Sequence, residues 1–196
     1  MSSFFEVLAL IYLIIFLPIP IVGIIAHSAI NFWRRLGMFS YFIFVLFWFF
    51  FGVIIVYYKE KILEVQFSSN VFLIALGVVL VVIAFYVDSM RSKVFDLKKL
   101  IGFSEVMPNR FKQELVTVGI YSKIRHPRYL AFMLLSCGAA FITGFYYAYL
   151  AAVYMIVGLF ILIFIEEREL RNRFGKSYVN YCKRVPMLVP QVWRLK

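Results

Sequence analysis

Long runs of apolar residues alternate with polar segments along the chain and predict helices that cross a membrane. A helix needs about 20 mostly apolar residues to span the hydrocarbon core of a bilayer. Five runs meet that length, and we expect spans at about residues 4–30, 38–58, 70–87, 128–145 and 147–165. The pattern therefore predicts an all-α, polytopic membrane protein with five transmembrane helices.

Proline and glycine shape two of these predicted regions. Pro18 and Pro20 lie in the middle of the first run. Because proline removes a backbone donor, they should kink the span or split it into two helical halves. The last two runs are separated by little more than Gly144, which predicts a tight antiparallel hairpin over residues 128–165.

Composition excludes several classes of protein. The 196 residues are 64% hydrophobic and only 16% charged, whereas soluble domains have about 25% charged residues. A soluble domain of this length could not bury so many apolar side chains. The net charge of +11 falls in a few loops and not along one face, so we expect no nucleic-acid partner. No obligate protein partner is evident either.

The distribution of Lys and Arg predicts an orientation, because cytoplasmic loops carry an excess of both. Of the 21 basic residues, only Lys59 and Lys61 lie between the second and third runs, and the others follow the first, third or fifth run. We therefore expect an integral, multi-pass protein of the cell membrane with its N-terminus outside and its C-terminus in the cytoplasm. It would form one domain over 1–196, with three spans in 1–87, a cytoplasmic connector in 88–127, the hairpin in 128–165 and a cytoplasmic C-terminal segment in 166–196.

The first concentration of chemically useful side chains precedes the fourth span. Pro127 suits the opening position of a helix, which leaves His126 near its cap. The free N–H groups of a helix start favour a carboxylate or phosphate. Tyr129 lies about one turn beyond His126, so both can face one pocket, and Gly119 permits a tight approach before Tyr121. The alternative is that Arg125, His126 and Arg128 are interfacial anchors.

The second concentration follows the fifth span. Glu167 with Arg171, and Glu169 with Arg173, form i,i+4 pairs that stabilise a helix. Glu166 has no such local partner, and an unpaired carboxylate at the end of an apolar run often marks function. The alternative is that Glu166 merely reaches interfacial water. The two histidines and two cysteines are far apart in the sequence and predict no metal site.

In these segments the chain resembles the isoprenylcysteine carboxyl methyltransferase family of integral membrane enzymes, in the short format of its prokaryotic members. The resemblance covers about residues 113–190. The matching residues are Leu115, Val116, Thr117, Gly119, Tyr121, Arg125, His126, Pro127 and Tyr129, then Glu166, Glu167, Leu170, Phe174, Gly175, Tyr178, Tyr181, Val185, Pro186 and Pro190.

The resemblance implies a methyltransferase that uses S-adenosylmethionine, releases S-adenosylhomocysteine and binds the cofactor in its cytoplasmic segments. The cofactor contacts that it implies are Gln113, Glu114, Leu115, Val116, Gly119, Tyr121, His126, Pro127, Arg128, Tyr129, Glu166 and Glu167. It further implies a lipidic or prenylated acceptor, such as an isoprenylcysteine carboxylate, that enters from the bilayer. Alignment of the reactants can supply much of the acceleration, so no catalytic side chain is assigned.

One departure from the family concerns the acceptor. Eukaryotic members carry an arginine about one turn before the two glutamates, whereas residues 161–165 here are all apolar. Arg125, Arg171 or Arg173 are the candidates to pair a substrate carboxylate instead. The sequence leaves open a phospholipid amine N-methyltransferase, an NADPH-dependent membrane reductase of the sterol type, and a non-catalytic membrane subunit that binds anionic lipid.

Overall fold

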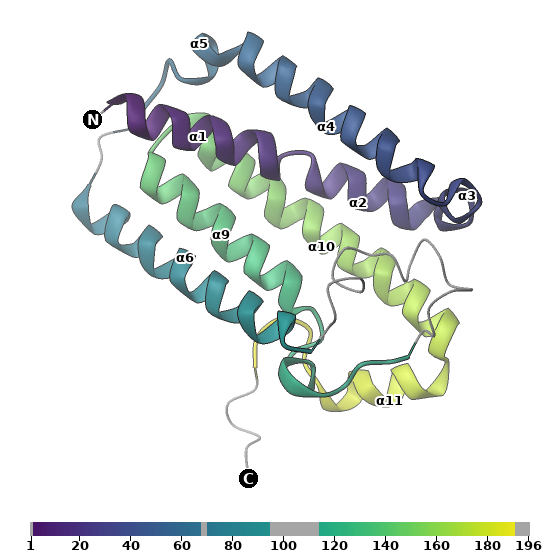
Figure 1. Cartoon of the computed structure of the whole chain (residues 1–196). Helices are drawn as coiled ribbons and strands as arrows, with labels where there is room; N and C mark the ends of the chain where they lie inside the picture. The colour runs from purple at the N-terminus through teal and green to yellow at the C-terminus, as the bar shows by residue number, and fades with distance from the viewer. Residues whose placement is uncertain (1, 68–69, 95–113, 191–196) are drawn as a thin grey trace.

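The chain folds into a helical bundle whose long helices lie roughly side by side (Figure 1). The computed structural model describes residues 2–67, 70–94 and 114–190. Within these residues every named element is helical, which confirms the all-α class. The elements are α1 (Ser2–Phe16), α2 (Ile19–Ser28), α3 (Ile30–Leu36), α4 (Phe39–Tyr57), α5 (Lys59–Ile62), α6 (Val71–Ser92), the 3₁₀ helix η1 (Gly119–Ser122), α9 (Pro127–Thr143), α10 (Tyr146–Phe174) and α11 (Lys176–Arg184).

The first predicted span is split as its prolines suggest. Helix α1 ends at Phe16 and α2 begins at Ile19, immediately after Pro18. Pro18 has no N–H to continue the ladder of α1, but its carbonyl accepts from Val22 N at 2.9 Å and so starts α2. The split into two helical halves is therefore confirmed.

Four regions of the described chain are long and apolar enough to cross a membrane: Ser3–Ser28, Phe39–Tyr57, Val71–Ser92 and Tyr146–Phe174. The fourth predicted span corresponds to α9, which has 17 residues. At 1.5 Å per residue α9 is about 26 Å long, somewhat shorter than a hydrocarbon core of about 30 Å. The number of five spans therefore stays a prediction.

One predicted boundary differs from the structure. We expected the last span to end near Ile165 and a separate segment to follow, but α10 continues without a break to Phe174. The two predicted i,i+4 pairs, Glu167–Arg171 and Glu169–Arg173, are both formed and stabilise this extension. The acidic residues are thus held on a rigid helix that also forms part of the bundle.

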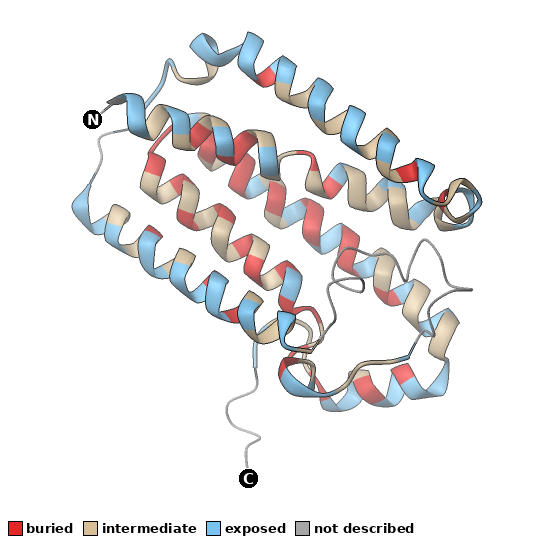
Figure 2. Ribbon diagram, viewed as in Figure 1, coloured by how far each residue is buried: buried red, intermediate tan, exposed pale blue. Residues whose placement is uncertain are grey.

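Helix α9 lies at the centre of the bundle, between α6 and α10 (Figure 2). It approaches α6 closely at two glycines, because a Cβ atom added to Gly77 would lie 2.8 Å from the carbonyl oxygen of Gly138. Small residues of this kind allow membrane helices to pack backbone against backbone. Helix α1 joins α9 through a buried hydrogen bond of 2.5 Å between the hydroxyls of Tyr12 and Ser136.

Helix α2 packs against α10 in the same manner. A Cβ atom added to Gly158 would lie 2.5 Å from Pro20 Cβ, and one added to Gly23 would lie 2.5 Å from Leu162 Cδ2. Glycine on each helix therefore sets how closely the two helices approach. This contact fixes the split first span against the helix that carries the glutamates.

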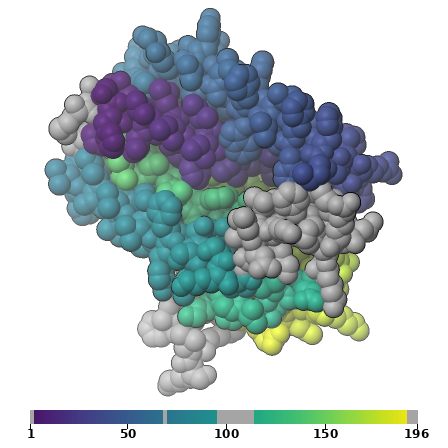
Figure 3. Space-filling model, in the orientation of Figure 1, coloured from purple at the N-terminus to yellow at the C-terminus, as the bar shows by residue number. Residues whose placement is uncertain are grey.

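The two ends of the bundle have different structures. At one end Gly144, with φ of 71°, closes the turn between α9 and α10, as the sequence predicts. The segment before α6 is fastened to this turn, since Phe67 N donates to Gly144 O at 2.9 Å and Tyr146 N donates to Val65 O at 3.0 Å. At the other end α11, in yellow, lies along the edge of the molecule (Figure 3). The polar segments gather at this second end.

Candidate functional site

The start of α9 is fixed by backbone hydrogen bonds to the chain that follows α11. Arg125 N donates to Pro186 O at 2.9 Å, and His126 N donates to Met187 O at 3.0 Å. Pro127 occupies the first turn of α9, and His126 is the N-cap residue with φ of −121°. The prediction of a helix start at this position is confirmed. The arrangement holds the His126 side chain at the junction of α9, α10 and α11.

A cluster of charged groups, buried except for Arg171, surrounds Glu167. Glu167 Oε1 accepts from Arg125 Nε at 2.9 Å, from Arg125 Nη2 at 2.6 Å and from His126 Nε2 at 3.2 Å. Its other oxygen, Oε2, accepts from Arg171 Nη2 at 3.1 Å. The side chains of Glu167 and Arg125 are only 4% and 9% exposed. We call Glu167, Arg125, His126 and Arg171 the Glu167 cluster.

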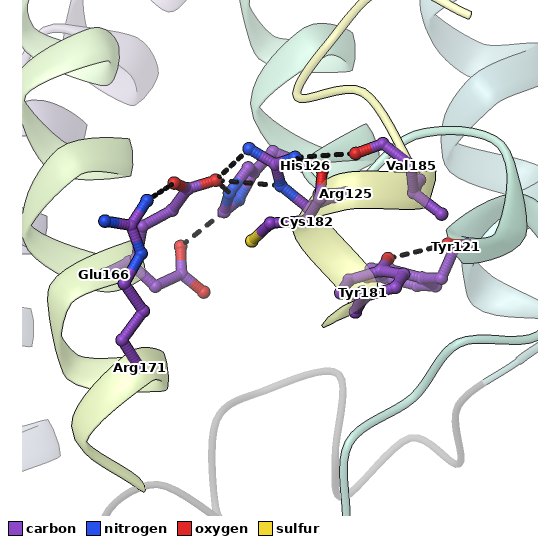
Figure 4. Close-up of polar contacts among 9 residues, drawn as sticks. Tyr121, Arg125, His126, Glu166, Arg171, Tyr181, Cys182 and Val185 are labelled. Atoms are coloured by element: carbon purple, nitrogen blue, oxygen red, sulfur yellow. Dashed lines mark hydrogen bonds and ion pairs between the residues drawn. The ribbon is translucent and has the colours of Figure 1, made fainter. Parts of the chain in front are cut away.

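Arg125 connects this cluster to α11. Its Nη1 donates to Val185 O at 2.6 Å and to Cys182 O at 3.2 Å, so its described bonds reach both the carboxylate and the backbone (Figure 4). Burial alone would lower the pKa of Arg125, but the hydrogen bond and ion pair with Glu167 raise it. A buried charge that is paired and hydrogen-bonded in this way is costly to disturb. Arg125 therefore acts as a clamp between α10 and α11.

Glu166 occupies a different environment from Glu167. Its Oε2 lies 3.7 Å from His126 Nδ1, too far for a hydrogen bond. The same oxygen is buried and has no hydrogen-bond partner among the described residues. An unsatisfied buried carboxylate oxygen is unfavourable unless a donor reaches it. A ligand with hydroxyl or ammonium donors would satisfy Glu166 at this position.

A second buried atom without a described partner lies nearby. The hydroxyl of Tyr178, on α11, is buried and makes no hydrogen bond within the described chain. Burial raises the pKa of this phenol, as does the nearby negative charge of Glu167. The group therefore stays protonated and can donate to a ligand. Tyr178 belongs to the pattern of the resemblance but was not among the predicted site residues.

Tyr121 lies within η1, the turn that Gly119 begins. Gly119 has φ of 62°, which favours glycine, and a Cβ atom there would lie 2.7 Å from Val94 Cγ2. The carbonyl of Tyr121 accepts from the Tyr181 hydroxyl at 2.6 Å, which ties η1 to α11. Burial raises the pKa of Tyr121 to about 12, and the charges of Arg91 and Glu166 act on it as well. Tyr121 thus lies within electrostatic range of Glu166.

The remaining predicted cofactor contacts are spread around this junction. Leu115 packs against the cluster formed by Tyr178 and Tyr181, and Val116 is half-buried. Tyr129 is buried with its ring 5.7 Å from that of His126, whereas Arg128 is exposed and lies over the ring of Phe132. Glu114 is exposed. Gln113 lies outside the described residues.

The three arginines considered for a substrate carboxylate differ in availability. The guanidinium of Arg125 is bonded within the Glu167 cluster. Arg173 pairs with Glu169, which also accepts from His27 Nδ1 at 3.0 Å and so connects α2 to α10. The side chain of Arg171 is 56% exposed. Arg171 is therefore the candidate that an incoming anion reaches most readily.

The geometry brings His126, Glu166, Glu167 and Tyr121 to one end of the bundle, although they come from distant parts of the sequence. This end of the bundle therefore carries carboxylate acceptors, protonated phenol donors and an imidazole, next to apolar helices. Among the described residues no group of three or more His, Cys, Asp or Glu side chains could hold a metal ion. The arrangement suits a small charged organic ligand.

Comparison with known proteins places the chain in a family. The family model described as phospholipid methyltransferase matches residues 65–177. Methanethiol S-methyltransferase 1 of Bradyrhizobium diazoefficiens is 38% identical over 97 residues, which are 48% of this chain and 30% of that protein. Protein-S-isoprenylcysteine O-methyltransferase of Schizosaccharomyces pombe is 32% identical over 94 residues, 46% of this chain and 40% of that protein.

A plant relative gives the same result. Protein-S-isoprenylcysteine O-methyltransferase B of Arabidopsis thaliana is 36% identical over 80 residues, 40% of this chain and 41% of that protein. The chain thus matches less than half the length of each of these curated relatives. The family model, in contrast, covers more than half of the chain and includes η1, α9 and all of α10. The chain belongs to the phospholipid methyltransferase family of membrane methyltransferases.

Proposed function

We propose that the protein is a methyltransferase that uses S-adenosylmethionine and methylates a lipidic or prenylated acceptor, such as an isoprenylcysteine carboxylate, at the membrane interface. The observation that carries the proposal is the buried, unpartnered Oε2 of Glu166 beside His126. A donor-bearing cofactor would supply what this oxygen lacks. Family membership makes a methyl donor the natural choice.

The residues of the chain would bind and orient the cofactor. When bound, S-adenosylmethionine supplies an electrophilic methyl group and leaves as S-adenosylhomocysteine. Glu166 would accept from its hydroxyl or ammonium donors, since charge-assisted hydrogen bonds are the stronger kind. The start of α9 at His126 would face its carboxylate. Leu115 and Val116 would flank its adenine.

Glu167 and Arg125 would serve this site indirectly. They hold His126 and the chain after α11 in place, through hydrogen bonds of 2.6–3.2 Å. A methyl transfer of this kind depends on alignment of the reactants, and orientation can contribute up to about 7–11 kcal/mol. A rigid cluster behind the cofactor would therefore help to align the reactants. No side chain needs to act as a nucleophile.

The proposed membrane arrangement has five spans, with α9 as the fourth. The N-terminus would be outside and the Glu167 cluster on the cytoplasmic side, in keeping with the positions of the basic residues. All 196 residues would form one domain. In this arrangement the cofactor reaches the site from the cytoplasm and the acceptor from the bilayer.

A second candidate acceptor is a thiol. The relative from Bradyrhizobium diazoefficiens is named for S-methylation of methanethiol. In this chain, residues 161–165, the turn of α10 before Glu166, contain no charged side chain that would pair a carboxylate. A thiol has no carboxylate to pair, although its proton must be released to solvent when the S–C bond forms. The absence of an arginine there is what favours this candidate.

Radiolabel transfer distinguishes the acceptors. The purified protein would be incubated with S-adenosylmethionine carrying a labelled methyl group and, separately, with a farnesylcysteine analogue, phosphatidylethanolamine or methanethiol. Label on the farnesylcysteine carboxylate supports the main proposal, and label on methanethiol supports the second candidate. Label on phosphatidylethanolamine would replace both with amine methylation.

Calorimetry separates methyl transfer from the other classes. Tight binding of S-adenosylhomocysteine is expected, with no comparable binding of NADPH. Binding of NADPH alone would instead support a membrane reductase. Binding of neither ligand would contradict a cofactor site and leave a non-catalytic membrane subunit.

A further inference from the structure

One face of α10 carries a groove that shares Glu167 and Arg171 with the Glu167 cluster but does not include Glu166. The groove has a volume of about 270 Å³ and is lined by Phe164, Glu167, Arg168, Arg171 and Asn172. These positions recur at intervals of three and four residues, so they lie on one face of the helix. Glu166 is not among the lining residues, and its Oε2 lies 3.7 Å from His126 Nδ1.

The groove is cationic on its open side. The charge of Glu167 at its base is offset by Arg125, whose Nη2 lies 2.6 Å from Glu167 Oε1. Arg171 donates one hydrogen bond to Glu167, and its side chain is otherwise largely exposed. Arg168 is exposed and makes no ion pair within the described chain. Two guanidinium groups are thus presented outwards, and an anion is the complementary ligand.

An apolar stripe leads along the same face of α10 to the groove. It consists of exposed side chains spaced at three or four residues, Val153, Val157, Phe160 and Phe164. Within a membrane such a stripe contacts hydrocarbon chains. It ends at Phe164, one turn before Arg168, so the two arginines lie where the apolar face gives way to polar side chains. Arginine at this depth meets lipid headgroups.

The size of the groove argues against a second cofactor site. Pockets for drug-sized ligands occupy about 300–1,000 Å³, and this groove is smaller. It can hold a headgroup while the attached chain lies outside it on the apolar stripe. The ligand that fits both parts is an amphiphile with one compact anionic group.

We propose that this groove binds one anionic membrane lipid, with its phosphate on Arg168, Arg171 and Asn172 and an acyl chain along Val153, Val157, Phe160 and Phe164. The site does not include Glu166, on which the proposed cofactor site rests, and lipid binding there does not depend on methyl transfer. Arg168 and Arg171 would contact the phosphate, Arg171 while keeping its bond to Glu167. The lipid would also anchor the extension of α10 at the interface.

Native mass spectrometry of the detergent-solubilised protein tests the proposal. Phosphatidylglycerol is expected to bind at one equivalent, at least tenfold more tightly than phosphatidylcholine. The double variant Arg168→Gln/Arg171→Gln should lose that preference. The matched double variant Lys176→Gln/Arg184→Gln removes the same charge outside the groove and should keep it. Loss of the preference in both double variants would show that binding follows net charge, and retention in both would show that the groove is not the site. Either result would overturn the proposal.

Two further measurements keep the test decisive. Since Arg171 also bonds Glu167, the single variant Arg168→Gln removes a groove arginine without touching the cluster, and we expect it to weaken phosphatidylglycerol binding at least threefold. Unchanged binding in this variant would contradict the site. Competition with inorganic phosphate separates the two sources of the anion. Millimolar phosphate should leave the lipid bound, and displacement would show a site for free anions instead.

Discussion

Helices α4 and α10 are both long apolar helices of nearly equal hydropathy, yet they occupy opposite environments. In the most apolar window of α4, 11% of the residues are buried inside the protein, against 44% in that of α10. Helix α4 contacts α1 and short neighbouring helices, whereas α10 contacts α1, α2, α9 and α11 (Figure 2). Apolar character alone therefore shows that a segment can enter a membrane, and not whether it faces lipid or protein.

Side-chain size accounts for the difference. Helix α4 is rich in phenylalanine, and Phe49 and Phe50 are among its most exposed residues. Helix α10 buries Ala148, Ala151, Ala152 and Gly158, which let neighbouring helices approach closely. The close approach then supports the polar extension of α10, where the Glu167 cluster forms. Small residues in the span and charged residues beyond it thus act together.

The largest effect should come from removing the carboxylate of the Glu167 cluster. Glu167→Ala leaves Arg125 buried without its partner, and breaking a buried ion pair costs about 3–5 kcal/mol. We expect a loss of that size in the free energy of unfolding, measured by denaturation in detergent micelles. The control is Glu60→Ala on α5 beside α4, an exposed glutamate, which should change stability by less than about 0.5 kcal/mol. Equal losses of stability in the two variants would contradict the difference that we describe between α10 and the region of α4 and α5.

Alanine at two helical glycines gives a smaller effect that tests packing directly. Gly158→Ala on α10 places a Cβ atom 2.5 Å from Pro20 Cβ, and overpacking of this kind costs about 1–3 kcal/mol. Gly52→Ala on α4 meets only Ile14 Cγ2, at an ordinary 3.5 Å. For Gly52→Ala we expect a free energy of unfolding that is unchanged or up to about 1 kcal/mol higher, because alanine favours helix. A stabilised Gly158→Ala protein would contradict the close packing of α2 on α10.

The smallest effect is expected on the exposed face of α4. Phe50→Ala removes a side chain that is 68% exposed, and the free energy of unfolding should change by no more than about 0.5 kcal/mol. The same denaturation measurement applies. A loss above about 2 kcal/mol would show that protein, and not lipid, covers this face in the folded state.

Much of the architecture follows from local signals in the sequence. Pro18 ends α1 and Pro127 opens α9 because proline fixes φ and has no N–H, and Gly144 closes the turn to α10 because glycine adopts a positive φ readily. The i,i+4 pairs of α10 are likewise local. Signals of this kind act within one helical turn and can be read without knowing the rest of the fold.

The Glu167 cluster could not be read in the same way. The sequence offered Arg171 as the partner of Glu167, but the shorter bonds come from Arg125, which lies 42 positions earlier. The bond between His27 and Glu169 also joins distant segments, and the buried hydroxyl of Tyr178 is likewise placed by tertiary packing. Packing of α2 and α11 against α10 creates these contacts, and no periodicity in the sequence specifies it. The signal for this site in the sequence was the adjacent pair Arg125 and His126, together with the two consecutive glutamates on α10.

The cofactor site is tested most directly by calorimetric titration of S-adenosylhomocysteine into Glu166→Gln. The amide replaces the carboxylate whose Oε2 has no described partner, so we expect affinity to fall at least tenfold while the protein stays folded. The matched variant Glu169→Gln changes an acid that lies about one turn further along α10 and bonds His27, and it should bind as the unaltered protein does. Equal affinity of the Glu166→Gln variant and the unaltered protein would contradict a cofactor held at Glu166.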